Sequence, residues 1–146
     1  MVHFSARHRF SDWPNPTIPP TAAGVYLVWE GERLIYCGMS GRGIEKESAA
    51  RKRGLVTRLA SHASGRLSGD QFCVYVANRI IIPSLSSEQL SRFATGELTL
   101  DALTRAYIAE RLEYQFTVVG NSSEAFELER SYRAGARGLK PLLNPA

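Results

Sequence analysis

Two short apolar runs separated by a polar turn in the first third of the chain predict a β-hairpin. Two β-rich runs, 24–29 (GVYLVW) and 33–37 (RLIYC), flank a Glu-Gly-Glu turn at 30–32. An odd-numbered loop centred on the glycine would place Tyr26 directly across from Tyr36, with both phenols on one face of the sheet. A two-residue loop would send them to opposite faces, so the shared face depends on the loop type.

Helical spacing follows the hairpin. Apolar residues recur every four positions over 55–63, and Gly65 is a suitable helix stop. Arg58 and His62 form a second pair, four residues apart, at the edge of this apolar stripe. One helix is therefore expected to carry both side chains on neighbouring positions.

The second half of the chain alternates between strand and helix patterns. The expected elements are a strand at 71–77, helices at 86–94 and 100–112, a strand at 113–119 and a helix from 122 to about 134. Thr99 caps the second of these helices, and Asn121 with Glu124 resembles a capping box for the last. This order favours an α/β or α+β fold in which helices flank a small, mostly antiparallel sheet.

The length of 146 residues suits one domain behind a short arm. Four prolines make residues 1–22 an extended N-terminal arm, so we expect the domain itself to span 23–146. A helical insertion at about 84–112 would form a lid, a dimer face or a solvated surface.

Composition excludes several classes of protein. No apolar run approaches the roughly 20 residues of a membrane span, and the first residues lack the charged-then-apolar pattern of a secretion signal. We therefore expect a cytoplasmic protein without a membrane partner. Cys37 and Cys73 lie in apolar, strand-like runs without zinc-ligand spacing, which indicates reduced core thiols.

Positive charge is concentrated in one stretch. The formal net charge is +4, but residues 42–66 alone hold seven basic and two acidic side chains, leaving a net −1 elsewhere. Most of the basic residues are arginines, which form forked contacts to phosphate oxygens. The stretch predicts an anionic partner, with a solvated charged loop as the alternative.

Glu129 is the carboxylate expected to face the sheet. At 100° per residue, Ala125, Leu128 and Tyr132 share one arc of the helix, and Glu129 lies at its border while the other two glutamates point away. A core-facing carboxylate is costly unless an arginine, a hydrogen-bond network or a metal compensates it. A structural ion pair and a metal ligand both remain open from the pattern alone.

Five short features, in this order, resemble the GIY-YIG nuclease family over residues 24–144. They are Gly24-Val25-Tyr26, Tyr36-Cys37-Gly38, the Arg58 and His62 pair, Glu129, and Asn144 in a Pro-Leu-Leu-Asn tail. The resemblance implies a three-stranded antiparallel sheet flanked by helices. It also implies hydrolysis of DNA phosphodiesters at a site with one divalent metal and no small-molecule cofactor.

The resemblance assigns the phosphate and the metal to two residues. Glu129 would hold the single Mg²⁺ or Mn²⁺, and Arg58 would grip the scissile phosphate. These charges can stabilise the transition state on its nonbridging oxygens. The residues expected to contact DNA are Arg42, Lys46, Arg51, Lys52, Arg53 and Arg58.

The same resemblance gives the uncharged groups their roles. Tyr26 or Tyr36 would help to activate water, and His62 would add a hydrogen bond or a proton at the same face. A phenol has an ordinary pKa of about 10, so it needs help to act as a base. Asn144 would fix the tail near the site.

Three functions follow from these observations. The first is a stand-alone endonuclease, which would cut both strands as a homodimer or in two encounters. Many relatives have a lysine where this chain has Met39, which motivates the alternative of a catalytically inactive nucleic-acid-binding domain of the same fold. A structural or protein-binding role is the third, and the charge of residues 42–66 argues against it.

Overall fold

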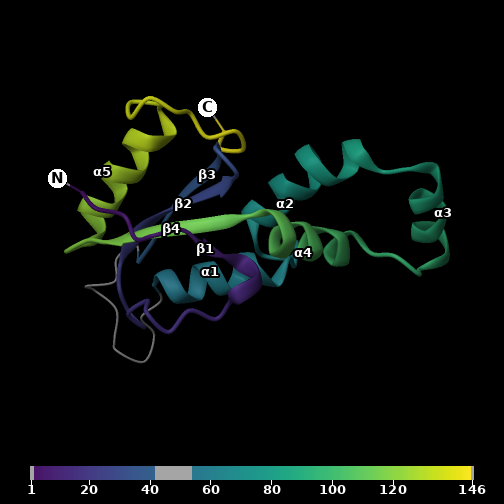
Figure 1. The fold of residues 1–146 in the computed structure, drawn as a ribbon, viewed down its shortest axis with the longest axis horizontal. Helices are drawn as coiled ribbons and strands as arrows, with labels where there is room; N and C mark the ends of the chain where they lie inside the picture. The colour runs from purple at the N-terminus through teal and green to yellow at the C-terminus, as the bar shows by residue number, and fades with distance from the viewer. Residues whose placement is uncertain (1, 42–53, 146) are drawn as a thin grey trace.

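A four-stranded antiparallel sheet forms the centre of the computed structural model, which describes residues 2–41 and 54–145. The strands lie in the order β1-β4-β2-β3 (Figure 1). Their bounds are His8–Arg9 for β1, Gly24–Glu30 for β2, Arg33–Ser40 for β3 and Glu113–Val118 for β4. The expected α+β fold with a small antiparallel sheet is confirmed, and β3 is an edge strand.

The hairpin between β2 and β3 has a two-residue turn. Glu30 pairs with Arg33, and Gly31 in the turn has a φ of 58°, which glycine adopts without strain. Tyr26 therefore does not pair directly with Tyr36, as it would across an odd-numbered loop. By itself, this turn would place the two phenols on opposite faces of the sheet.

A bulge in β3 restores the shared face. The pairing shifts by one residue between Val28 and Trp29, which leaves Ile35 as an extra residue on β3. As a result, Tyr26 and Tyr36 lie on the same face, with their ring centroids 6.4 Å apart. The two phenols thus share a face despite the two-residue turn, because the bulge shifts the register.

Helices cover both faces of the sheet (Figure 1). Helix α5 (Ser122–Arg133) packs on one face, whereas α1 (Leu55–Ser64) and α2 (Gln71–Val76) contribute to the core on the other. The first core holds Val25, Leu27, Leu34, Cys37, Ala125 and Leu128. The second includes Tyr26, Val28, Ile35, Leu59, Phe72, Val76, Ile108 and Tyr114. Both cysteines are free and buried.

Residues 71–77 are helical, so the predicted strand there is wrong. The Asp70 carboxylate accepts a hydrogen bond from the Cys73 N–H and caps α2. Phe72, Cys73 and Val76 are buried with the spacing of one helix face. A short apolar run fits either a buried strand or a buried helix, and the cap decides between them here.

The helical region continues well beyond α2. A π-helical turn (Ala77–Ile81) and a 3-10 turn (Ile82–Ser84) lead to α3 (Ser87–Thr95) and α4 (Leu100–Arg111). The predicted helices at 86–94 and 100–112 are confirmed, as is the Thr99 cap. Figure 1 shows α3 at the end of the molecule farthest from α5.

The strand at 113–119 and the last helix also lie where the sequence predicts them. Asn121 accepts a hydrogen bond from the Glu124 N–H, as in a capping box. The Glu124 carboxylate, however, accepts from the Gly120 N–H. β4 therefore runs directly into the helix that carries Glu129.

The N-terminal segment packs against the domain. Its prolines leave it largely without helix, as expected, but β1 pairs with β4 and adds a strand that the sequence did not predict. Phe10 and Ile18 are buried in the core that contains Tyr26. Among the described residues, no helix is long and apolar enough to cross a membrane.

Candidate functional site

A hollow of about 390 Å³ opens beside β3. The C-terminal tail covers the outer edge of this strand, where the Leu142 and Leu143 N–H groups donate to β3 carbonyls. These edge contacts end at Cys37, which binds the Asn144 side chain. Gly38 and Met39, the next residues along the strand, line the hollow.

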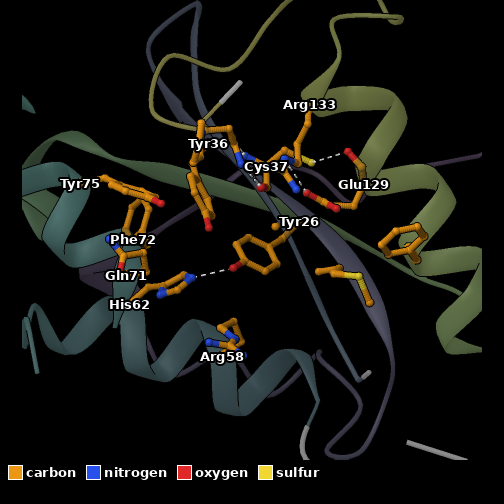
Figure 2. A pocket seen from close by; sticks show the side chains of 15 residues that line it. Tyr26, Tyr36, Cys37, Arg58, His62, Gln71, Phe72, Tyr75, Glu129 and Arg133 are labelled. Carbon is orange, nitrogen blue, oxygen red and sulfur yellow. Dashed lines mark hydrogen bonds and ion pairs between the residues drawn. The ribbon is translucent and has the colours of Figure 1, made fainter. Parts of the chain in front are cut away.

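Side chains from both faces of the sheet meet in this hollow (Figure 2). Tyr26, Tyr36 and α1 lie on one face, while Glu129 reaches the hollow from α5 on the other. The structure thus brings together all six residues predicted to be catalytic: Tyr26, Tyr36, Arg58, His62, Glu129 and Asn144.

Glycine is required where β3 passes the Tyr26 ring. Gly38 pairs with Tyr26 across the sheet, and a Cβ at this position would collide with the phenol ring and its hydroxyl group. Tyr26 is only 1% exposed, and its ring packs against His62 and Tyr36. Gly38 therefore allows the Tyr26 hydroxyl to lie at the bottom of the hollow.

A buried chain of hydrogen bonds links Tyr26, His62 and Asp70. The Tyr26 hydroxyl lies 2.6 Å from His62 Nε2, and His62 Nδ1 lies 2.7 Å from Asp70 Oδ2. The Ser61 hydroxyl also donates to Oδ2 at 2.6 Å, and the Cys73 N–H donates to Oδ1 at 2.9 Å. All the hydrogen-bonding partners of the Asp70 carboxylate are therefore fixed by α1 and α2.

The sequence did not indicate Asp70. Its signal is the position just before an apolar run that begins a helix, where aspartate is a preferred N-cap. Taking 71–77 as a strand hid that signal. Asp70 follows His62 by eight residues in the sequence. Their contact becomes evident only once the turn between α1 and α2 is known.

The environment sets the charges in this chain. Burial lowers the pKa of His62, although the Asp70 carboxylate opposes this shift. Burial alone would raise the pKa of Asp70, but hydrogen bonds from His62, Ser61 and the Cys73 N–H hold it at about 2. At neutral pH, the buried pair is a neutral imidazole beside an ionised carboxylate.

Both phenols stay protonated at neutral pH. Burial raises the pKa of Tyr26 well above its ordinary value and that of Tyr36 to about 12, while Arg58 opposes both shifts. Figure 2 shows the Tyr36 and Tyr26 hydroxyls pointing toward the same space as the His62 ring. A phenol here can act as a base only if it passes its own proton to a neighbour.

Arg58 supplies a cation at the wall of the hollow. It lies one helical turn before His62 on α1, and its side chain is exposed. Within the described parts of the chain, it has no ion-pair partner. Its guanidinium is therefore available to an anion that enters the hollow.

Glu129 faces both an arginine and the hollow. It is 7% exposed, and its carboxylate lies 3.3 Å from the Arg133 guanidinium. Burial raises the pKa of Glu129, and Arg133 opposes the shift. The sequence left open whether Glu129 forms an ion pair or serves as a metal ligand. The geometry allows both, because Glu129 pairs with Arg133 and also lines the hollow.

The described residues include no group of three or more His, Cys, Asp or Glu side chains that could hold a metal. Glu129 can therefore contribute one ligand. Hard cations such as Mg²⁺ accept water and phosphate oxygens as further ligands, and the hollow has room for both. The residues fit a metal site that the substrate completes.

Asn144 holds the tail to β3. Its Oδ1 accepts a hydrogen bond from the Cys37 N–H at 2.8 Å, and its Nδ2 donates to the Cys37 carbonyl at 2.9 Å. The side chain thus continues the strand pairing that Leu142 and Leu143 begin. This placement agrees with the expected role of fixing the tail beside the site.

The predicted basic stretch is only partly visible. Arg42, Lys46, Arg51, Lys52 and Arg53 lie outside the described residues, as does their predicted contact with DNA.

A second group of cations borders the site instead. Arg130, Arg133 and Lys140 line a hollow of about 370 Å³ that also touches Glu129. The sequence could have indicated this group, because residues 130–140 include four basic and no acidic side chains.

Comparisons of the chain with protein-family models, with curated proteins and with solved structures give no match. A proposal for its function therefore depends on the chemistry of the hollow and on the short motifs that resemble a known family.

We expect His62 to make stability depend on pH. Because its pKa is lowered from 6.5 in the folded state, the unfolded chain binds the proton more readily, and stability falls as the pH drops below about 6.5. Urea unfolding at pH 7.5 and 5.5 should show this loss in the wild type, at most about 1.4 kcal/mol per pH unit for one proton.

The control for this prediction removes the titrating ring. His62→Gln should reduce the pH dependence of the unfolding free energy relative to the wild type. Asp70 also has a lowered pKa, but its contribution is lost only below its ordinary value of 3.8, outside this window. Equal pH dependence in the wild type and His62→Gln would contradict the assignment.

Proposed function

We propose that this chain is a metal-dependent endonuclease of the GIY-YIG kind, which hydrolyses DNA phosphodiesters. The main support is the hollow beside β3, where an exposed arginine, a buried carboxylate and a hydrogen-bonded Tyr26–His62 pair face one space. Phosphoryl transfer needs this combination of positive charge for the phosphate and a path for the proton of water.

Arg58 is the group that binds the scissile phosphate. Its planar guanidinium can donate two parallel hydrogen bonds to nonbridging oxygens, which gain negative charge in the transition state.

The proton of the attacking water leaves through Tyr26. The water oxygen forms a bond to phosphorus, the bond from phosphorus to the leaving deoxyribose oxygen breaks, and that oxygen takes up a proton from solvent water. As the water gives its proton to the Tyr26 oxygen, the hydroxyl proton of Tyr26 passes to His62 Nε2, 2.6 Å away. This path avoids a lasting phenolate, which the raised pKa of Tyr26 disfavours.

Tyr36 has a different role in this arrangement. It is half-buried, and its hydroxyl has no hydrogen-bond partner among the residues that the structure describes. It can therefore orient the attacking water by a hydrogen bond without taking up its proton.

Glu129 is the residue that would hold Mg²⁺ or Mn²⁺. When bound, the cation supplies positive charge to the nonbridging oxygens. Arg133 favours the ionised form of the Glu129 carboxylate, because the ion pair opposes the rise in its pKa that burial causes.

The second hollow suits the continuing DNA backbone. Arg130 and Lys140 are exposed cations, and Arg133 joins their hollow to Glu129. A polyanion bound at Arg58 would therefore meet further positive charge across the site. A cytoplasmic location is part of the same proposal and agrees with two free, buried cysteines.

Plasmid cleavage tests the proposed function. With Mg²⁺ or Mn²⁺, the wild type should nick or linearise plasmid DNA, and Glu129→Gln and Arg58→Ala should each lose about 100-fold or more of the rate. Glu127→Gln, on the same helix, and Arg92→Ala, on α3, are matched controls that should cut at close to the wild-type rate.

Two outcomes would overturn the proposed nuclease function. One is a wild type that binds DNA but cuts no form of it, which would favour the inactive binding domain. The other is cleavage that persists unchanged in both site variants, which would indicate a contaminating enzyme.

DNA binding tests the second hollow separately from cleavage. In a Glu129→Gln background, Arg130→Ala with Lys140→Ala should reduce the slope of log affinity against log salt by about 2, because two phosphate contacts are lost. A control that also removes two positive charges, Arg92→Ala with Arg111→Ala, should leave the slope unchanged. Equal slopes in the two double variants would place the DNA elsewhere.

A further inference from the structure

We propose that Asp70 is a positioning residue that fixes His62 in the tautomer with the proton on Nδ1, leaving Nε2 free to accept the Tyr26 proton. This inference rests on the proposed nuclease function for its catalytic consequence. Its structural part, the tautomer of one ring, stands on the buried contacts of Asp70 alone.

The two oxygens of Asp70 have separate tasks. Oδ1 accepts the Cys73 N–H and caps α2, as any good N-cap would. Oδ2 faces His62 Nδ1 at 2.7 Å and also accepts from the Ser61 hydroxyl. A helix cap requires only the first oxygen, so the second is available to orient the imidazole.

Packing prevents the ring from choosing another arrangement. His62 and Asp70 are each 2% exposed, so bulk water does not compete for either ring nitrogen. The Phe72 ring lies 4.6 Å from the imidazole, and the Tyr26 and Tyr36 rings lie 5.4 and 6.2 Å away, measured between centroids. The imidazole is held between aromatic rings with one nitrogen toward Asp70 and the other toward Tyr26.

The direction of both hydrogen bonds follows from the carboxylate. An ionised carboxylate only accepts hydrogen bonds, so the proton between His62 and Asp70 belongs to Nδ1. The neutral ring then has a lone pair on Nε2, and the Tyr26 hydroxyl must donate to it. Tyr26 keeps its oxygen lone pairs toward the hollow, where they can accept a proton from water.

Each proton in the step is accounted for. Water gives one proton to the Tyr26 oxygen, Tyr26 gives its own to Nε2, and His62 becomes an imidazolium beside the Asp70 carboxylate. The leaving deoxyribose oxygen takes up a proton from solvent water. After the product leaves, the proton on Nε2 returns to Tyr26, which releases a proton to solvent. Asp70 neither touches the substrate nor accepts a proton, and it acts only through His62.

Asp70→Asn separates orientation from helix capping. The amide oxygen can still accept the Cys73 N–H, whereas the amide NH₂ in place of Oδ2 donates to His62 Nδ1. The ring must then carry its proton on Nε2 and donate to Tyr26, which reverses the hydrogen bond. Ser61→Ala is the matched control, because it removes a contact to Oδ2 but leaves the carboxylate in place.

Ring-nitrogen NMR and single-turnover cleavage test the inference together. The chain has three histidines, and His62→Gln identifies the His62 signals in protein labelled with ¹⁵N-histidine. We expect Nδ1–H in the wild type and Ser61→Ala, but Nε2–H in Asp70→Asn. The cleavage rate of Asp70→Asn should fall about 100-fold or more with little change in DNA affinity, while Ser61→Ala stays within a few-fold of the wild type.

Three results would overturn it. An Nε2–H tautomer in the wild type excludes it without any variant, even if Asp70→Asn fails to fold. An unchanged tautomer in folded Asp70→Asn would leave Asp70 as a helix cap only. A changed tautomer with an unchanged cleavage rate would show that the tautomer has no effect on cleavage, which removes the positioning role. A wild type that cuts no DNA overturns the proposed function, and the NMR then decides separately whether Asp70 sets the tautomer.

Discussion

The bulge in the β2–β3 hairpin is the constraint on which the site depends. Side chains alternate between faces along a strand, so a two-residue turn without the extra residue Ile35 would carry Tyr36 to the α5 side. With the bulge, Tyr36 joins Tyr26 beside α1, and Cys37 faces Glu129 on α5. The inserted residue thus places both phenols on one face of the sheet and leaves the Glu129 carboxylate on the other. All three groups lie beside the same edge strand and line one hollow.

Buried polar groups at this edge are costly, and each has a compensating partner. Asp70 accepts hydrogen bonds from His62, Ser61 and the Cys73 N–H, and Glu129 pairs with Arg133. The contacts of Asp70 also cap α2, so the fold of one helix and the orientation of His62 depend on the same carboxylate.

Sequence patterns within one helix identified the residues whose orientation depends on that helix alone. The arc of the last helix predicted that Glu129 faces the sheet, and the spacing of Arg58 and His62 placed both on one helix. Asp70 was missed because its contact with His62 arises from the packing of α1 against α2. The register of the hairpin was also beyond the pattern, because an odd loop and a bulged two-residue turn both give Tyr26 and Tyr36 one face.

A structure with DNA and Mn²⁺ tests most directly the claim that this hollow holds a phosphodiester. The Tyr26→Phe variant, which lacks the proton path, should trap a short uncut duplex. We expect anomalous scattering from Mn²⁺ at the Glu129 carboxylate, with a phosphate oxygen coordinated to the same ion and the Arg58 guanidinium bound to that phosphate. Manganese absent from Glu129, or a duplex bound on another face of the protein, would contradict the account.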